Sequence, residues 1–291
     1  MNISTSTLPR WLLALVSVLV LAGIACWYWP QPRSAMYSIY RESGKSRTLS
    51  ALANYETKSS QHFVVYFTSS DQNVADMILE TAESVYQPVV KQMGHEPGGK
   101  VPLVVYASRD DLRHAFGWGN SESAVGVYWA GTIRLLSPNV WIHDKRPPQQ
   151  QQAYAKVNPI AHEFTHYLLD YMTNGNYPRW FTEGLAQWVE HRVTGYLWIE
   201  DSNKLDQKLY SMDDLNSRFD GLPNQALAYR ESYLIVDYIA QTQGDQGIAN
   251  LVQQLQAGHS FASAVQQVAG RSESALYDQW FQWVQQHLSA L

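Results

Sequence analysis

The sequence predicts an α+β fold, with strands and helices mixed in the first half and helices alone in the second. Strand-like apolar runs occupy residues 62–67, 101–106 and 125–136. The third run contains a glycine turn, so we expect it to be a hairpin. Apolar residues recur at helical spacing in residues 71–92 and 110–116. Beyond Leu205 the pattern is helical, and it closes with a stripe of Leu276, Trp280, Val284 and Leu288.

Length and charge narrow the possible classes of protein. The 291 residues are enough for one large domain or two small ones. The formal net charge is −5 and the lysines and arginines are scattered, so we expect no nucleic-acid partner. The single cysteine, Cys26, lies in an apolar N-terminal run, and the rest of the chain therefore cannot form an internal disulfide.

Residues 1–30 contain an apolar run from Trp11 to Trp29 that carries no charge. A helix of this length extends about 28 Å, close to the hydrocarbon thickness of a bilayer. We therefore expect an N-terminal transmembrane helix that anchors the protein in a membrane. Two alternatives stay open, namely a signal peptide cleaved after Ala25, with small residues Gly23 and Ala25 at the −3 and −1 positions, and a lipid attached to Cys26.

Basic residues on both sides of this run bear on its orientation. Arg10 precedes it, and the basic residues that follow it are Arg33, Arg41, Lys45 and Arg47. A strict count of flanking positive charge would place the large domain in the cytoplasm. A short arm before one apolar run is also typical of an export signal. We expect a single-pass N-terminal anchor with an extracytoplasmic domain.

Two polar stretches are expected to lack regular structure. Residues 31–59 are weakly patterned and suit a linker, so the folded domain is predicted to span residues 60–291. Residues 143–152 combine two adjacent prolines with a run of glutamines, which predicts a loop. This loop lies just before the motif described next, so it could be a lid or an ordinary solvated loop.

The motif His-Glu-Phe-Thr-His, from His162 to His166, carries the chemistry. We expect it on a helix that begins near Asn158 and stops at residues 174–175. Helical residues four apart lie on one face, so the two histidines can bind one metal ion. Glu163 would then lie beside the open coordination position, where a carboxylate can take a proton from a water molecule.

A second segment, Pro-Arg-Trp-Phe-Thr-Glu-Gly-Leu-Ala at residues 178–186, supplies a third candidate ligand. A catalytic zinc site needs three protein ligands, and two histidines with one glutamate are an established set. Glu183 is the candidate. Gly184 and Ala186 are small, and we expect them to let this second helix approach the first.

Together these two segments resemble the gluzincin metallopeptidases, specifically the group with peptidase MA-like domains. The resemblance implies a zincin-like fold over residues 60–291, with a mixed sheet, a metal-binding helix and a helical C-terminal half. It also implies that zinc binds His162, His166 and Glu183, and that Glu163 is the catalytic base. The substrate would be a peptide or protein, whose backbone pairs with an edge strand from the hairpin.

Other residues are candidates for supporting roles. Asp170 and Gln187 lie one turn after a metal ligand and could orient a histidine, while Glu190 lies a further turn on. Many gluzincins have an acidic residue where this chain has Gln187, which leaves the orienting group open. Tyr229 could donate a hydrogen bond to an oxyanion, although simple packing in a helix interface explains it equally well.

The expected function is therefore zinc-dependent peptide hydrolysis, with a metal-activated water and Glu163 as general base. The alternative is a membrane-tethered binding or scaffold module that keeps the gluzincin fold without catalysis. The intact Glu163 favours the enzyme, because a structural zinc site has no use for a base beside an open coordination position. The sequence determines neither the substrate, nor endo- versus exopeptidase action, nor the oligomeric state.

Overall fold

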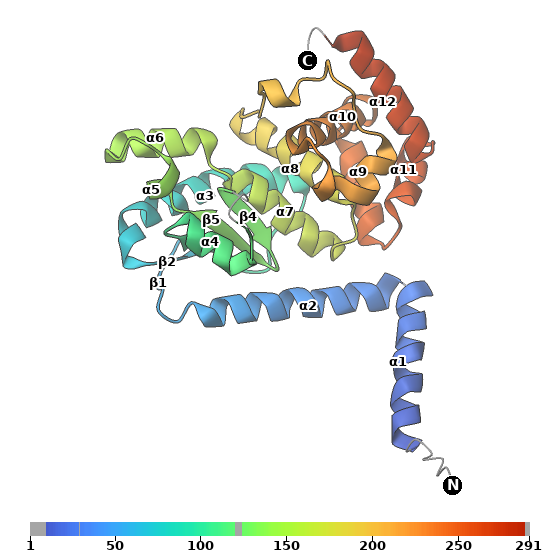
Figure 1. The fold of residues 1–291 in the computed structure, drawn as a ribbon, viewed down its shortest axis with the longest axis horizontal. Coiled ribbons are helices and arrows are strands. Elements are labelled where there is room, and N and C mark those ends of the chain that lie inside the picture. The colour runs from blue at the N-terminus through green and yellow to red at the C-terminus, as the bar shows by residue number, and fades with distance from the viewer. Residues whose placement is uncertain (1–9, 29, 120–123, 289–291) are drawn as a thin grey trace, which may run out of the picture.

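A five-stranded mixed sheet forms the first half of the fold in the computed structural model, which describes residues 10–28, 30–119 and 124–288 (Figure 1). The strand order is β1-β2-β3-β5-β4, with β2, β3 and β5 parallel and both edge strands antiparallel to their neighbours. The strands are β1 (Glu56–Ser59), β2 (Phe63–Phe67), β3 (Val101–Tyr106), β4 (Gly126–Trp129) and β5 (Thr132–Leu136). The predicted α+β class and the predicted hairpin, β4–β5, are confirmed.

Helices cover both faces of this sheet. On one face, α3 (Gln72–Met93) and α7 (Ile160–Thr173) pack on alternate strand residues such as Val65, Leu103 and Ile133. On the other face, α4 (Arg109–Phe116) and the end of α2 (Pro30–Ala51) cover Val104 and Leu136. Because β3 and β5 are covered on both sides, every one of their residues is buried.

The second half of the described chain is helical. Here α8 (Arg179–Thr194) packs between α7 and the long helix α10 (Gln225–Gln256), which kinks at Gly244, where φ is 72°. The remaining elements are α9 (Met212–Arg218), α11 (Phe261–Ala269), α12 (Glu273–His287) and short 3-10 turns at Ser69–Asp71, Asp201–Asn203 and Phe219–Gly221. Of the predicted final stripe, Leu276, Trp280 and Val284 are buried in the core, whereas Leu288 is exposed.

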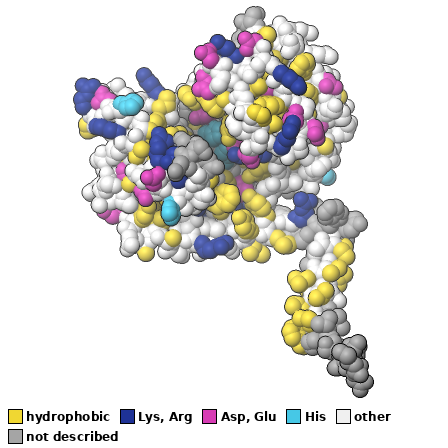
Figure 2. Space-filling view, in the orientation of Figure 1, with side chains coloured by type: hydrophobic (Ala, Val, Ile, Leu, Met, Phe, Trp, Pro, Cys, Tyr) yellow, Lys and Arg dark blue, Asp and Glu magenta, His cyan; other side chains and the backbone are white. Residues whose placement is uncertain are grey.

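The N-terminal segments differ from the expectation in two respects. The apolar run forms a helix, α1 (Arg10–Tyr28), which extends away from the rest of the molecule and carries apolar side chains (Figure 2). Among the residues that the structure describes, however, no helix combines the length and apolar character needed to cross a membrane. The predicted transmembrane helix is thus not found. The predicted linker contains α2, a helix that lies along the domain (Figure 1).

The expected loop at residues 143–152 is also largely helical. Short α5 (Pro138–Trp141) precedes it, and α6 (Pro147–Val157) includes both prolines and the glutamine run. Proline is well tolerated in the first turn of a helix, because the N–H groups there have no intrahelical partner. Pro147 and Pro148 therefore start this helix rather than prevent it.

Candidate metal and active site

The ends of α7, the helix that carries both candidate metal-binding histidines, follow from its sequence. Before its first turn, the Asn158 side chain accepts a hydrogen bond from the N–H of Ile160 at 3.1 Å. Beyond its last turn, Asn174 and Gly175 take left-handed conformations, with φ of 51° and 73°. The start and the stop thus agree with the sequence prediction.

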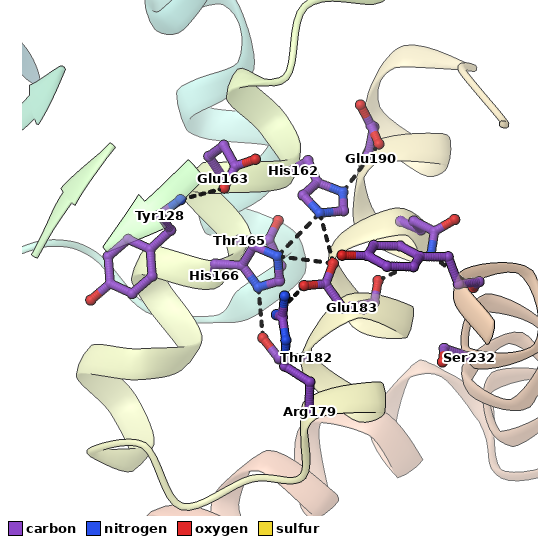
Figure 3. Close-up of polar contacts among 12 residues, drawn as sticks. Tyr128, His162, Glu163, Thr165, His166, Arg179, Thr182, Glu183, Glu190 and Ser232 are labelled. Carbon is purple, nitrogen blue, oxygen red and sulfur yellow. Dashed lines mark hydrogen bonds and ion pairs between the residues drawn. The ribbon is translucent and has the colours of Figure 1, made fainter. Parts of the chain in front are cut away.

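The orientation of α7 is set by its apolar side. Ile160, Phe164 and Leu168 are fully buried, and Phe164 stacks against Tyr86 of α3. This packing turns another face of α7, which carries both histidines, toward α8 (Figure 3). Histidine side chains are visible in the hollow between the two halves of the molecule in Figure 2.

Three donor atoms from α7 and α8 meet at one point. Nε2 of His162 lies 3.1 Å from Nε2 of His166 and 3.2 Å from Oε2 of Glu183. The third side of this triangle, from His166 Nε2 to Glu183 Oε2, is 3.4 Å. Zinc bonds of about 2.0–2.2 Å in tetrahedral geometry separate two ligand atoms by about 3.3–3.5 Å. Both the spacing and the chemistry of the donors therefore fit zinc.

The two imidazoles are held at their other nitrogens. Nδ1 of His162 lies 3.3 Å from Oε2 of Glu190, and Nδ1 of His166 lies 2.6 Å from Oγ1 of Thr182 (Figure 3). Such contacts fix the tautomer and the ring orientation, so that Nε2 is presented to a metal.

The carboxylate of Glu183 is oriented in the same way. Arg179, one turn earlier on α8, contacts its Oε1, which leaves Oε2 for the metal. Burial alone would raise the pKa of Glu183, but the charges of His166 and Arg179 hold it well below its usual range. Burial would lower the pKa of His162, but Glu183 and Glu190 hold it well above its usual range.

Glu163 lies beside this triangle and faces the edge strand β4. Its Oε2 accepts a hydrogen bond from the backbone N–H of Tyr128 at 2.6 Å (Figure 3). Burial raises the pKa of Glu163, and the two metal-site histidines partly offset that rise. A carboxylate with a raised pKa is a better proton acceptor than an ordinary one.

The close approach of β4 to α7 depends on Gly126. A Cβ atom at this position would lie 2.7 Å from the ring of Pro159 and 3.0 Å from Cγ of Glu163. Any larger residue would push the edge strand away from the start of α7 and thus away from Glu163.

The family model of the Peptidase MA superfamily matches residues 81–286 of this chain. The chain belongs to the peptidase MA superfamily. The resemblance drawn from the two motif segments is thus confirmed.

The chain also resembles solved structures in its fold. The fold is similar to that of Legionella pneumophila aminopeptidase A, solved in complex with aspartic acid, with a TM-score of 0.49 and 16% sequence identity. That match covers 78% of this chain and 27% of the aminopeptidase, so this chain spans about a quarter of its length. None of the curated proteins matches this chain in sequence.

Within this peptidase MA domain, two predicted orienting residues have other partners. Asp170 accepts hydrogen bonds from three tyrosines and Arg41 instead of a histidine. Gln187 donates to the carbonyl oxygens of Tyr229 and Glu183. The prediction failed because the side chains one turn after a ligand point toward neighbouring elements that the motif does not reveal.

Gly184 also differs from its expected role. A Cβ atom there would lie 2.2 Å from the carbonyl oxygen of Ser232 and 2.9 Å from Cγ2 of Val236, both on α10. The glycine therefore permits contact between α8 and α10 instead of between α8 and α7. This close contact holds α10 against α8, the helix that carries the candidate ligand Glu183.

Tyr229 lies near the start of α10 with its ring against Phe219 and Trp198. Burial, followed by the negative charge of Glu183, raises the pKa of its hydroxyl group. The hydroxyl thus stays protonated and can donate a hydrogen bond. Its catalytic role stays a prediction.

Three supporting residues were missed from the sequence. Thr182 adjoins Glu183 in the chain, and Arg179 lies one helical turn before it, so helical spacing could have indicated both. Tyr128 reaches Glu163 across 35 residues, and no local pattern indicates such a contact.

Proposed function

We propose that this chain is a zinc-dependent peptidase that hydrolyses peptide bonds in a peptide or protein substrate. The observation that supports it best is the triangle of His162 Nε2, His166 Nε2 and Glu183 Oε2, with sides of 3.1 to 3.4 Å. Glu163 lies next to the two histidines on the same helix turn and has a raised pKa.

In this proposal the three side chains of the triangle hold the metal. When bound, zinc supplies Lewis acidity, which lowers the pKa of a water molecule and polarises a peptide carbonyl. Glu163 removes a proton from the attacking water and delivers it to the leaving amine. The Tyr128 N–H holds Oε2 of Glu163, so Oε1 is the oxygen that exchanges the proton. Tyr229 is the proposed hydrogen-bond donor to the oxygen on which negative charge develops.

The open edge of β4 is the proposed place for the substrate backbone. Val125 faces β5, since its carbonyl accepts from the N–H of Leu136 at 2.9 Å. Backbone groups alternate along a strand, so those of Gly126 and Tyr128 point away from β5. The Tyr128 N–H already donates to Glu163, so the substrate would pair with the other backbone groups of these two residues. An extended peptide can pair with such an edge beside the metal site.

Zinc content and peptide hydrolysis of the full chain test this function. We expect about one zinc per chain in the wild type, and its loss in His162→Ala and Glu183→Ala. Glu163→Gln should keep the metal but lose hydrolysis by at least about a hundredfold. His191→Ala is the matched control, because His191 lies on α8 and contacts the carbonyl of Tyr196 instead of the donor triangle.

Two results would contradict the proposal. Undiminished hydrolysis in Glu163→Gln would remove Glu163 from the mechanism. A folded wild-type chain that holds zinc and binds peptides without cleaving them would favour the non-catalytic scaffold.

A further inference from the structure

A fully buried carboxylate, Asp170, connects three separate parts of the fold to the metal helix. Its Oδ1 accepts hydrogen bonds from Tyr37 of α2 at 2.6 Å and from Tyr177 at 3.1 Å. Its Oδ2 accepts from Tyr128 of β4 at 2.6 Å and contacts Nη1 of Arg41 at 3.3 Å. A buried charge with this many partners restricts each of the elements that supply them.

Tyr128 is the only one of these partners that also contacts Glu163, within the described residues. Its hydroxyl donates to Asp170, and its backbone N–H donates to Oε2 of Glu163 at 2.6 Å. Both acceptors are on α7, two helical turns apart. Tyr128 therefore attaches β4 to α7 at two points, through its backbone N–H to Glu163 and through its side-chain hydroxyl to Asp170.

Helix α2 supports this attachment from the outside. Arg41 supplies the positive charge that compensates Asp170, and its side chain is 7% exposed. A Cβ atom at Gly44 would lie 2.7 Å from Cβ of Ala130, so α2 is in close contact with the β4–β5 turn. Helix α2 thus limits the movement of the hairpin that carries Tyr128.

We infer that Tyr128, anchored by Asp170, is a positioning residue for Glu163. This inference rests on the proposed function, because it assigns Glu163 a proton to transfer. A glutamate carboxylate turns freely about its last bond unless one oxygen is held. The Tyr128 N–H holds Oε2 only while β4 keeps its place, and the Asp170 hydrogen bond keeps it there.

The variant Tyr128→Phe tests the inference, because it removes the hydroxyl but keeps the ring and the backbone N–H. The matched control is Tyr37→Phe, which loses a hydrogen bond of equal length, 2.6 Å, to the same carboxylate. Tyr37→Phe loses this one hydrogen bond, whereas Tyr128→Phe also removes the acceptor of the Gly131 N–H at 3.2 Å, so a somewhat larger loss of stability is expected for Tyr128→Phe. Only Tyr128→Phe loosens β4 where it contacts Glu163.

Three measurements on the full-length chain distinguish the variants. We expect kcat of Tyr128→Phe to fall about tenfold, with KM changed less and zinc content unchanged, since small misplacements of a reacting group are costly. Tyr37→Phe should keep kcat within about twofold. Hydrogen exchange followed by mass spectrometry should show faster exchange of residues 126–130 in Tyr128→Phe but not in Tyr37→Phe. Gly131 is left out because its N–H loses its acceptor, the Tyr128 hydroxyl, in the variant itself.

Equal kcat values and equal exchange in the two variants would overturn the inference, since Asp170 would then be only a structural hub. A loss of zinc in Tyr128→Phe that accounts for the fall in kcat would overturn it as well. If the wild type hydrolyses no peptide, the proposed function fails. The exchange of residues 126–130 then still decides whether Tyr128 holds β4 against Glu163.

Discussion

Nδ1 of His162 lies 3.3 Å from Oε2 of Glu190, two helical turns beyond the candidate metal ligand Glu183 on α8. Gln187, one turn beyond Glu183, instead donates to the Tyr229 carbonyl at 2.9 Å. Glu190 thus orients the first histidine from a position one turn farther along the helix. The residue that orients a metal-binding histidine can therefore occupy either of two positions on a helix, provided that its carboxylate oxygen reaches the same ring nitrogen.

Replacing Glu190 should weaken metal binding. Glu190→Gln removes the charge that supports His162, and losing such a partner typically costs about 10–100-fold in metal affinity. Competition with a chromophoric zinc chelator measures this change. Glu56→Gln, an equal change of charge on the exposed strand β1, is the control. Equal affinities in the two variants would contradict the orienting role.

Gly184→Ala should destabilise the fold in spite of the higher helix propensity of alanine. The new Cβ would lie 2.2 Å from the Ser232 carbonyl oxygen, so α8 and α10 would have to separate. Overpacking of this kind costs about 1–3 kcal/mol or more. Urea unfolding measures the loss, and Gly221→Ala is the control because nothing lies within 4 Å of a Cβ there. An unchanged unfolding midpoint would show that the helices separate without cost.

Arg41→Met should leave the Asp170 carboxylate buried without its countercharge. Breaking a buried ion pair by removing one partner costs about 3–5 kcal/mol. The free energy of unfolding should therefore fall by that order, while Arg47→Met, at an exposed position, should have little effect.

A double-mutant cycle separates the charge effect from lost packing. Adding Asp170→Asn to Arg41→Met should cost less than Asp170→Asn costs in the wild type, with a coupling energy of at least about 1 kcal/mol. Additive effects would mean that the two side chains do not act as a pair.

Glu231 should make stability depend on pH. Its carboxylate is fully buried on α10, and burial raises its pKa to about 8, although the Tyr210 N–H partly offsets the rise. Between the ordinary carboxyl pKa and about 8, the folded state keeps a proton that the unfolded state has lost. Stability therefore falls as the pH rises through this window, by up to about 1.4 kcal/mol per pH unit.

Glu231→Gln removes this titration and keeps an acceptor for Tyr210. Urea unfolding of both proteins at pH 5, 6.5 and 8, as about evenly spaced points across the window, gives the difference in unfolding free energy. Other titrating groups cancel in that difference. We expect the variant to gain on the wild type as the pH rises, and a constant difference would contradict the raised pKa.

Much of the architecture could be predicted from local patterns. Four of the five strands and most helices follow from apolar periodicity, whereas β1 lies in the predicted linker. The start and stop of α7 follow from Asn158 and Asn174–Gly175. The predictions failed where they relied on the composition of a segment and ignored the position of its residues within a helix. The paired prolines of α6 occupy the first turn, where they favour a helix. The residues of α2 are mostly polar, so the sequence did not reveal that one face of this helix packs on the domain.

The sequence by itself determined the superfamily and the three candidate metal ligands, because helical spacing and a short connection place these residues close together in any compact fold. It could not determine which residues hold these ligands, the proposed base Glu163 and the buried Asp170 in place. The contacts of Glu190 with His162, of Tyr128 with Glu163 and of Arg41 with Asp170 depend on how whole elements pack. Such packing places side chains far apart in the chain within hydrogen-bonding distance, and no periodic pattern records it. Cellular location stays a prediction of the N-terminal sequence.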